Sequence, residues 1–517
     1  MKEKRRVGRP KLADKKLKQK SILMIMFSFT LVITLILMGS INLISKNNYS
    51  KLKGLTLSNS QNDIIDFISV GSSDAVLIRS KGITCLVDAS NPLSDGSKQA
   101  VSNPHDSVGH VKEYLHKLKI NNLDYIVATH NHSDHIGGMN EIIEKYATKN
   151  TKYYYRKYTM TTDDVWHPDW QNKEYHDRSI NALYRKGAKL IDVTNRNNIK
   201  FKVGNFNIKL LNTSTVYQDE KYLGNPKNKG YGMTHGDNKN SIVELVTHIP
   251  SKTKTLLSSD METEDDRRLK VGKVKILKIG HHGYSSATSK EFADNVKPKD
   301  VIVSNSSVAA SSDIKLYMLS YLNEKYKSNV YVTGYSYDSV RAIFNKNGYS
   351  IVDDDGISST IKLKFKRTYS YNWKKLTITP VKVNKINNES KTVWYYMRNG
   401  MPIINKLENL AYGSKKNYYY FNHVGEMQTG WQKINNNWYY FNSVGEMQIG
   451  WKKLNYKGNN NWYYFESNGK MKTGWLKYKE KWYYFNNDGT MIYSKCKKID
   501  KKIYCFKKDG SCRGKCK

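Results

Sequence analysis

The sequence predicts an α/β domain between an N-terminal transmembrane helix and a C-terminal solenoid of β-hairpins. Three observations lead to this fold class. Buried, strand-like runs in the first two thirds of the chain end in histidine or aspartate, residues 21–44 carry no charge, and an aromatic pattern repeats near the C-terminus. With 517 residues, the chain is too long for a single hydrophobic core, so two or more domains are expected.

The N-terminal segment has the charge distribution of a membrane anchor. Residues 1–20 are rich in Lys and Arg, and the uncharged run at 21–44 is long enough to cross a bilayer as a helix. The basic flank predicts a cytoplasmic tail at 1–20 and an extracellular location for everything after residue 45. Because no small-x-small cleavage site is clear, the run is interpreted as a signal anchor that stays attached.

The next feature is a dense group of metal-binding side chains at 129–138, Thr-His-Asn-His-Ser-Asp-His-Ile-Gly-Gly. It follows the run 123–128, which has the composition of a buried strand. Neutral imidazole and carboxylate are the preferred ligands of zinc and similar cations. Alternate residues of an extended turn direct two imidazoles at one metal, while the next Asp-His pair turns toward a second. The candidate ligands are His130, His132, Asp134 and His135.

Further strand-like runs end in residues of the same kind. The run 84–90 contains Asp88, 255–260 ends in Asp260, and 274–283 ends in the doublet His281-His282 before Gly283. The HxHxDH pattern is the signature of the metallo-β-lactamase superfamily, and residues 61–365 resemble that αββα sandwich. The doublet followed by Gly resembles the ComEC-like branch of the superfamily.

The resemblance implies a role for each of these side chains. Asp260 is expected to bridge two metals, and Asp88 to support the metal loop from behind. Within the doublet, His281 is chosen as the ligand because it directly follows the strand, with His282 as a supporting or substrate contact. The family places one more histidine near here, for which His235 is the nearest candidate; Asn238 or Asn240 are the alternatives.

The resemblance also implies a mechanism. Two divalent cations supply a hydroxide at neutral pH and hold the oxygens of an in-line displacement, with Asp134 as the catalytic carboxylate. Zinc is the first expectation, and manganese or iron also suit a His/Asp site. Phosphoesters, lactones, thioesters and β-lactams are all substrates within the superfamily, so the motif defines the mechanism more narrowly than the substrate.

The chain is strongly basic, with a formal net charge of +39. Such a charge predicts attraction to a polyanion, namely nucleic acid, anionic lipid or the phosphate-rich polymers of a bacterial wall. The excess of Lys over Arg favours diffuse attraction over bidentate recognition of single phosphates. Abundant Lys, Asn, Tyr and Ile are also typical of AT-rich coding DNA, which accounts for part of the charge.

The C-terminal quarter repeats itself. The run 431–441, Trp-Gln-Lys-Ile-Asn-Asn-Asn-Trp-Tyr-Tyr-Phe, leads through a Gly-containing turn to Trp451, where the pattern begins again. Each unit is predicted to be a short β-hairpin. A single hairpin cannot bury its aromatic face, so neighbouring hairpins must stack into a solenoid. A degenerate earlier unit begins near Trp394.

These units resemble the cell-wall-binding repeats of Gram-positive surface proteins, the group that includes choline-binding modules. The resemblance implies aromatic cages between hairpins, and aromatic faces attract a quaternary ammonium cation. Choline is the expected ligand; a wall glycan, or no ligand with the rings serving as solenoid core, are the alternatives. The cage candidates are Trp431, Trp438, Tyr440, Trp451, Trp462, Tyr464, Trp475 and Trp482.

The last unit exchanges its cage aromatics for cysteines. Aligned with the preceding unit, Cys496 stands in place of Trp475, Cys505 in place of Tyr484, and Cys512 in place of Met491. A terminal repeat has no neighbour to pack against, so crosslinks are a sensible cap. With Cys516 there are enough cysteines for two disulfides outside the cell; a zinc knuckle is the alternative.

Together these features predict an enzyme at the surface of a Gram-positive bacterium, in contact with a wall polymer. A metal-dependent hydrolase joined to choline-type repeats resembles the teichoic acid phosphorylcholine esterases in architecture, which implies hydrolysis of a phosphodiester. The alternatives are a ComEC-like nuclease acting on extracellular DNA and an adhesin with secondary catalytic activity. The expected divisions are a tail at 1–20, the anchor at 21–44, a linker at 45–60, the hydrolase at 61–365, a linker at 366–390, repeats at 391–494 and a Cys-rich cap at 495–517.

Overall fold

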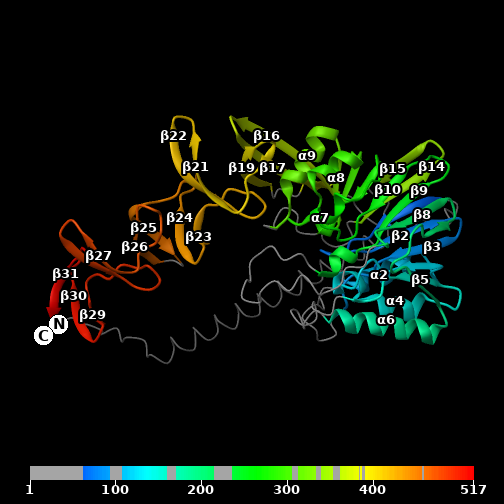
Figure 1. Ribbon diagram of the computed structural model, residues 1–517, viewed down its shortest axis with the longest axis horizontal. Coiled ribbons are helices and arrows are strands. Elements are labelled where there is room, and N and C mark those ends of the chain that lie inside the picture. Colours follow the sequence, from blue (N-terminus) through cyan, green and yellow to red (C-terminus); the bar gives the residue numbers. More distant parts are fainter. Residues whose placement is uncertain are drawn as a thin grey trace, which may run out of the picture.

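The computed structural model contains two stacked β-sheets followed by a row of hairpins (Figure 1). The tail, anchor and linker predicted for residues 1–60 lie outside the residues that it describes. No helix among the described residues is long and apolar enough to cross a membrane. The described residues are 62–93, 107–159, 171–214, 236–305, 313–333, 339–352, 361–382, 385–386, 390–456 and 459–516.

The first sheet has eight strands in the order β15-β14-β1-β2-β3-β4-β5-β6. Its antiparallel half joins β15 to β3, and its parallel half joins β3 to β6. Since parallel strands β3, β4 and β5 end at the same edge of the sheet, the loops that follow them meet there. The strands are β1 (Asp63–Phe67), β2 (Val76–Ser80), β3 (Ile83–Val87), β4 (Tyr125–Val127), β5 (Lys152–Tyr155), β6 (Lys189–Asp192), β14 (Val340–Asn345) and β15 (Gly348–Val352).

The second sheet has twelve strands, ordered β20-β19-β17-β16-β13-β12-β11-β10-β9-β8-β7, with β18 paired to β17. Strands β10 to β13 are parallel, so their carboxyl ends also share one edge. The strands are β7 (Lys200–Val203), β8 (Phe206–Leu211), β9 (Val243–His248), β10 (Lys254–Leu257), β11 (Ile276–Lys278), β12 (Asp300–Val303), β13 (Asn329–Val332), β16 (Ile361–Ser370), β17 (Trp373–Lys382), β18 (Lys385–Ile386), β19 (Lys391–Arg398) and β20 (Met401–Pro402).

Alternating side chains of the strands separate two apolar layers. Ile78 and Val87 pack between the sheets, where they meet residues such as Phe206 of the second sheet, whereas their neighbours Leu77 and Leu86 pack under helices. This confirms the predicted αββα sandwich. The first sheet is covered by α2 (Val108–Lys117), α4 (Met139–Tyr146) and α6 (Asn172–Lys186), and the second by α8 (Lys290–Val296) and α9 (Leu316–Tyr326).

The segment 366–390, expected to be a linker, is largely sheet. It contains the second half of β16 and all of β17, which extend the second sheet beyond β13. The alternation in β17 explains this, because Leu376 and Ile378 are buried while Lys375 and Thr377 are half-buried. The abundance of lysine hid a strand pattern with a period of two.

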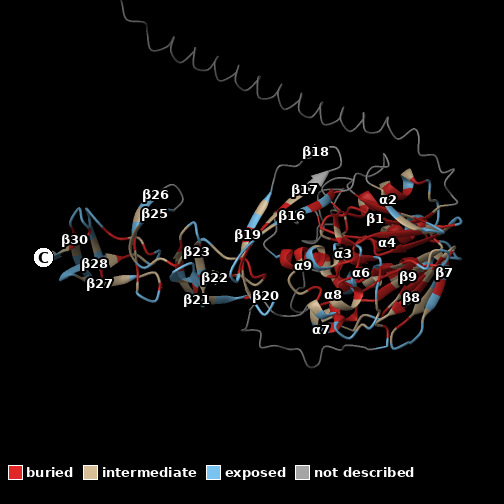
Figure 2. Cartoon of the chain, turned by 90° about the horizontal axis from the view of Figure 1, so that it is seen from above, coloured by how far each residue is buried: buried red, intermediate tan, exposed pale blue. Residues whose placement is uncertain are grey.

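Beyond β20 the chain forms the predicted hairpins, each with a fully buried phenylalanine at its end. Trp431 packs on Tyr463 and Phe465 of the next hairpin, with ring centroids 4.9 and 5.6 Å apart, so the aromatic faces are buried by stacking. Figure 2 shows the red, buried layers of the sandwich beside this more exposed arm. The hairpins pair β21 (Lys406–Tyr412) with β22 (Lys415–Phe421), β23 (Gly430–Ile434) with β24 (Asn437–Phe441), β25 (Gly450–Tyr456) with β26 (Asn459–Phe465) and β27 (Gly474–Tyr478) with β28 (Lys481–Phe485).

The terminal unit joins β29 (Cys496–Ile499), β30 (Lys502–Phe506) and β31 (Cys512–Cys516). Cys496 faces Cys505 across the hairpin, the same register in which Trp475 faces Tyr484, and the two cysteines form a disulfide. Cys512 is not disulfide-bonded, and its Sγ accepts a hydrogen bond from the Gly514 amide. One of the two expected crosslinks is therefore present among the described side chains.

Removing this crosslink is expected to loosen the terminal unit. Replacing Cys496 and Cys505 by Ser should lower its unfolding free energy by about 2–3 kcal/mol, since the disulfide closes a short loop. Limited proteolysis followed by mass spectrometry would report cleavage within 495–516 at lower protease concentration. Cys512→Ser, which breaks no disulfide, is the matched control, and equal proteolysis of both variants would contradict the assignment.

Candidate metal centre

The metal loop forms where β4 stops at the edge of the first sheet. Val127 is the last strand residue, and the short helix α3 (Ser133–Ile136) begins after His132. Asp88, in the loop after β3, accepts hydrogen bonds from the Thr129 amide at 2.9 Å and from the Thr129 hydroxyl at 2.8 Å. Its Oδ2 also lies 2.7 Å from Nδ1 of His135. Asp88 thus orients the loop and leaves the Nε2 side of His135 for other contacts.

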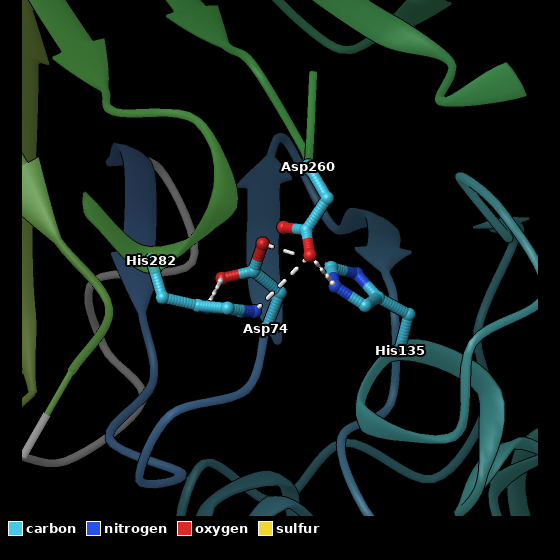
Figure 3. A group of neighbouring side chains, drawn as sticks. All are labelled: Asp74, His135, Asp260 and His282. Carbon is cyan, nitrogen blue, oxygen red and sulfur yellow. Dashed lines mark ion pairs between the residues drawn. The ribbon is translucent and has the colours of Figure 1, made fainter. Parts of the chain in front are cut away.

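Four buried side chains from four loops converge beside this loop (Figure 3). Asp74 precedes β2, His135 lies in α3, Asp260 follows β10, and His282 follows β11 in the short helix η7 (His281–Gly283). One potential ligand atom from each lies within 4.8 Å of the others. Because both sheets contribute through strand ends at the shared edge, the sandwich itself assembles the cluster.

The donor set fits a divalent cation. Asp74 Oδ1, His135 Nε2, Asp260 Oδ1 and His282 Nδ1 are all buried, and none makes a hydrogen bond within the part of the chain that the structure describes. Burying unpaired polar atoms is costly unless a further partner satisfies them. Imidazole nitrogens and carboxylate oxygens are suitable ligands for zinc, manganese or iron. These residues are therefore the ones that would hold the metal.

The acidic and basic side chains of the cluster shift one another's pKa values toward the charged forms. Burial opposes ionisation of Asp260, but His282 and His135 outweigh it and hold the pKa of this carboxyl well below its usual range. Burial alone would lower the pKa of His282, yet Asp260 and Asp74 raise it to about 9, so a cation that binds here must displace the proton of this ring. Burial, together with His135 and His132, holds the pKa of His130 well below normal, so this ring is neutral and able to coordinate a cation.

The remaining loop residues surround the four-residue cluster. Nε2 of His130 lies 3.1 Å from Nδ1 of His132, and the His130 ring centroid is 4.1 Å from that of His135. Asp134 Oδ2 lies 3.0 Å from His282 Nε2, and its side chain is 28% exposed, more than those of Asp74 or Asp260. Asp134 is thus the carboxylate of this group that faces the solvent.

Asp260 lies among the histidine rings of the metal loop and the doublet. Its Oδ2 lies 3.2 Å from His135 Nε2, 3.4 Å from His282 Nε2 and 3.7 Å from His281 Nε2. One carboxylate oxygen thus faces rings supplied by both the metal loop and the doublet.

The doublet is arranged differently from the expectation that His281 would be the ligand. His282 belongs to the four-residue cluster, whereas Nδ1 of His281 contacts the Ser286 hydroxyl at 2.6 Å. Both histidines have positive φ, 41° and 50°, and this turn directs the two rings to different sides. Because positive φ is uncommon outside glycine, the strand pattern could not indicate which of the two rings joins the cluster.

The segment before β9 supports the loop through Asp237. In the short helix η6 (Gly236–Asn240), its Oδ2 accepts hydrogen bonds from the Asn131 amide at 2.6 Å and from Asn131 Nδ2 at 3.0 Å. Asn240 Nδ2 donates to Asp237 Oδ1, while Asn238 Oδ1 is buried without a hydrogen bond among the described residues. His235, the predicted extra ligand, lies outside the described residues.

Sequence reasoning missed Asp74 and Lys278. Lys278, the last residue of β11, is buried and forms an ion pair with Asp74 Oδ2. Its Nζ also lies 3.3 Å from the Ser259 carbonyl. The only sequence signal for Asp74 was an acidic residue in the polar turn 71–74 between two apolar strands, and such a turn is usually solvated.

Close packing behind the loop gives a stability prediction. A Cβ added to Gly138 would lie 2.3 Å from Val108 Cβ and 2.7 Å from the Ala89 carbonyl oxygen. Gly138→Ala should therefore lower the unfolding free energy by about 1–3 kcal/mol and reduce metal content, because α2 and the metal loop must separate. Thermal unfolding with metal analysis would measure both; Asn140→Ala, at a half-buried position of α4, should change little.

The cage candidates of the repeats divide into half-buried and exposed rings. Trp431, Trp451 and Trp475 pack edge-on against neighbouring rings, whereas Trp438, Trp462 and Trp482 are 42, 39 and 48% exposed. Each hairpin carries one ring of each kind, for example Trp431 and Trp438 with centroids 6.3 Å apart and planes at 85°. The half-buried Tyr440 and Tyr464 lie beside the first tryptophan of their hairpins.

Comparison with known families agrees with both halves of this description. Residues 68–210 match the model of the metallo-beta-lactamase superfamily, and residues 428–473 and 450–495 match that of the choline-binding repeat. Recombination protein 2 of Haemophilus influenzae is 23% identical over 251 residues, which are 47% of this chain and 24% of that protein. The chain therefore spans about a quarter of the length of this relative.

Several solved structures align with the chain at low overall similarity. Choline binding protein F from Streptococcus pneumoniae, with a peptidoglycan analogue, is 23% identical and aligns over 34% of this chain and 63% of its own, with a TM-score of 0.18. The choline binding domain of Spr1274 from the same species is 35% identical over 17% of this chain and 96% of its own, with a TM-score of 0.15. The phage Cp-1 cell wall endolysin complexed with choline is 35% identical over 23% of this chain and 34% of its own, with a TM-score of 0.17.

Proposed function

We propose that this chain, which joins a metallo-beta-lactamase superfamily domain to choline-binding repeats, is a hydrolase of the Gram-positive cell surface. Its proposed substrate is a phosphodiester on a choline-bearing wall polymer, such as phosphorylcholine on teichoic acid. The observation that carries the catalytic half is the buried cluster of Asp74, His135, Asp260 and His282. The aromatic repeats support the choice of polymer, since their rings suit a quaternary ammonium group.

The chain's own residues prepare this site for hydrolysis. When bound, divalent cations supply an activated water and neutralise charge on the phosphoryl oxygens. Asp88 fixes the ring of His135 through Nδ1, and Asp260 lies between the loop and the doublet. The more exposed Asp134, hydrogen-bonded to His282 through Oδ2, is the group we assign to holding a proton during turnover.

The compartment is part of the proposal. We infer that residues 1–20 stay in the cytoplasm, that 21–44 anchor the chain in the membrane, and that both the hydrolase and the repeats face the wall. The net charge of +39 supports this, because wall polymers rich in phosphate attract a basic protein.

A nuclease is the second candidate. It is favoured by the similarity of 251 residues of this chain to Recombination protein 2, although that similarity covers only 24% of the relative. The same basic charge suits DNA. The repeats have no obvious task in such an enzyme, which is why the wall polymer is preferred.

A direct comparison of substrates separates the two candidates. The full-length protein in detergent, loaded with zinc or manganese, is given p-nitrophenylphosphorylcholine and single-stranded DNA in parallel. The proposal predicts turnover of the choline ester that is lost with EDTA and in His132→Ala. Cleavage of DNA alone would favour the nuclease, and retained turnover in His132→Ala would exclude the metal loop as its source.

A further inference from the structure

One face of the sheet extension is basic and polar, and it leads directly into an aromatic cavity. The residues of β16 that point to this side are Lys362, Lys364 and Lys366, and by register Lys375 of β17 lies on the same side. We call these four residues the lysine face. Alternate residues of a strand are about 6.6–6.8 Å apart, so the three lysines of β16 form a regular row.

The opposite side of the same strands is apolar and its charges are paired. Leu363, Leu376 and Ile378 pack in the core beside α9. On that side Lys374 contacts Glu324 Oε2 at 3.1 Å, and Arg367 contacts it at 3.5 Å. Among the described residues, the charged side chains of β16 and β17 that form ion pairs with the rest of the domain are therefore on the side that faces α9.

The lysine face has no such compensation. None of its four lysines has a carboxylate within 4.0 Å in the described part of the chain. Between the lysines and β19 lie hydroxyl groups, with Thr377 bonded to Thr392 at 2.9 Å and Thr379 bonded to Ser390 at 2.8 Å. Unpaired ammonium groups beside hydroxyl donors form a surface suited to phosphate oxygens.

The same face continues into a cavity of about 340 Å³ at the start of the arm. Trp373 faces Tyr396 and Lys375 faces Trp394, the register in which Trp431 faces Tyr440 and Lys433 faces Trp438. The first repeat-like hairpin is therefore built from β17 and β19, inside the hydrolase sheet and before the segment that matches the repeat family.

The lining of this cavity suits a cation. Its main components are Trp373, Trp394, Tyr412, Tyr419, Met427 and Glu446. Aromatic faces attract an alkylated ammonium group, and a carboxylate adds charge complementarity. Lys375 Nζ lies 5.5 Å from the centroid of the Trp394 ring, so a basic group stands at the edge of the cavity, where an anionic neighbour of the cation would lie.

We propose that the lysine face and this cavity form one binding surface for a polyanion that carries quaternary ammonium groups. The phosphates lie over Lys362, Lys364 and Lys366, and one ammonium group enters the cavity between Trp373 and Trp394. Because β16, β17 and β19 belong to the catalytic sheet, the polymer is held against the hydrolase domain itself as well as along the repeat arm. The surface rests on the proposed function for the identity of the polymer, and a phosphate chain without ammonium groups would use the lysines alone.

The test measures binding without turnover. Full-length protein in detergent and EDTA is titrated with choline-bearing teichoic acid, a choline-free poly(glycerol phosphate), single-stranded DNA and choline chloride. We expect the affinity for both teichoic polymers to fall about tenfold, and choline binding to stay unchanged, in the triple variant Lys362→Gln/Lys364→Gln/Lys366→Gln. Lys189→Gln/Lys200→Gln/Lys202→Gln removes three exposed strand lysines elsewhere and is the matched control.

Calorimetry with choline chloride counts the choline sites per chain and so tests the cavity. Trp394→Leu should remove one of these sites and weaken the binding of the choline-bearing polymer alone. Tyr371→Leu, at a ring that is 89% exposed, should have neither effect. Glu446→Gln, at the cavity edge, should weaken the same single site. An unchanged choline stoichiometry in Trp394→Leu would overturn the proposal. So would a lysine triple variant that binds both teichoic polymers as tightly as its control does, or one in which only the binding of DNA is weakened.

These outcomes are independent of the hydrolase assignment. If the variants lose binding as expected but the protein never releases phosphorylcholine, the surface stands and the proposed reaction fails. If the protein hydrolyses the choline ester while the variants bind normally, the reaction stands and the surface fails.

Discussion

Asp260→Asn is expected to reduce turnover at least about 100-fold and to lower the bound metal content, while the fold is retained. Substituting residues that merely support metal ligands typically lowers metal affinity or activity about 10–100-fold. Loss of the carboxylate that faces three histidines should therefore have a larger effect. Its pKa is held well below the usual range by His282 and His135 against the effect of burial, so the wild-type side chain is ionised at neutral pH. Asparagine keeps the shape and removes the charge.

The measurement combines steady-state rates with elemental analysis of the purified protein. The doublet provides the internal comparison, because His282→Ala should lose metal and activity together, whereas His281→Ala should keep most of its metal. A loss of metal in His281→Ala that exceeds the loss in His282→Ala would restore the assignment made from the strand pattern. Full activity in Asp260→Asn would exclude this cluster as the catalytic centre.

Phe465→Ala is expected to unfold the middle of the repeat arm. The ring is completely buried between Trp431 and Tyr440 of the preceding hairpin, with centroids 5.6 and 6.3 Å away. Truncating a buried phenylalanine typically costs about 3–5 kcal/mol. In a solenoid this loss falls on one unit and its neighbours, so retention on choline-agarose should drop while the hydrolase domain keeps its activity on a small soluble ester.

The control for this variant is Ile449→Ala, at a position that is 53% exposed just before β25. Calorimetry should show a separate, lowered transition for the arm in Phe465→Ala and an unchanged trace in Ile449→Ala. A single transition in which both domains shift together would contradict independent unfolding of the arm.

Much of the fold was readable because its signals are local. Each of the predicted strands before His130, Asp88 and Asp260 is a strand in the structure. Their order along the chain indicated the sandwich. The repeat arm was equally clear, since a hairpin with the same aromatic positions recurs along the chain. The alignment also placed Cys496 and Cys505 at the positions of Trp475 and Tyr484, but the pairing of the four cysteines was left open, and the structure shows that these two positions face each other and are crosslinked.

What sequence reasoning missed depends on contacts between distant segments. Asp74 joins the cluster only because β1 and β2 bring its turn to the strand ends that carry Asp260 and His282. The choice between His281 and His282 is decided by two positive φ angles, which leave no trace in composition. Residues 366–390 were assigned to a linker because the many lysines of β16 and β17 masked the alternation of these strands.

The proposed reaction of the metal cluster is cleavage of a phosphodiester on a choline-bearing wall polymer. Phosphorus NMR can follow this reaction in purified choline-bearing teichoic acid incubated with the metal-loaded full-length protein. A signal of free phosphorylcholine should grow with time and should be abolished by EDTA and by Asp260→Asn. An unchanged spectrum with the wild-type protein, under conditions where the same preparation degrades single-stranded DNA, would contradict the proposed reaction.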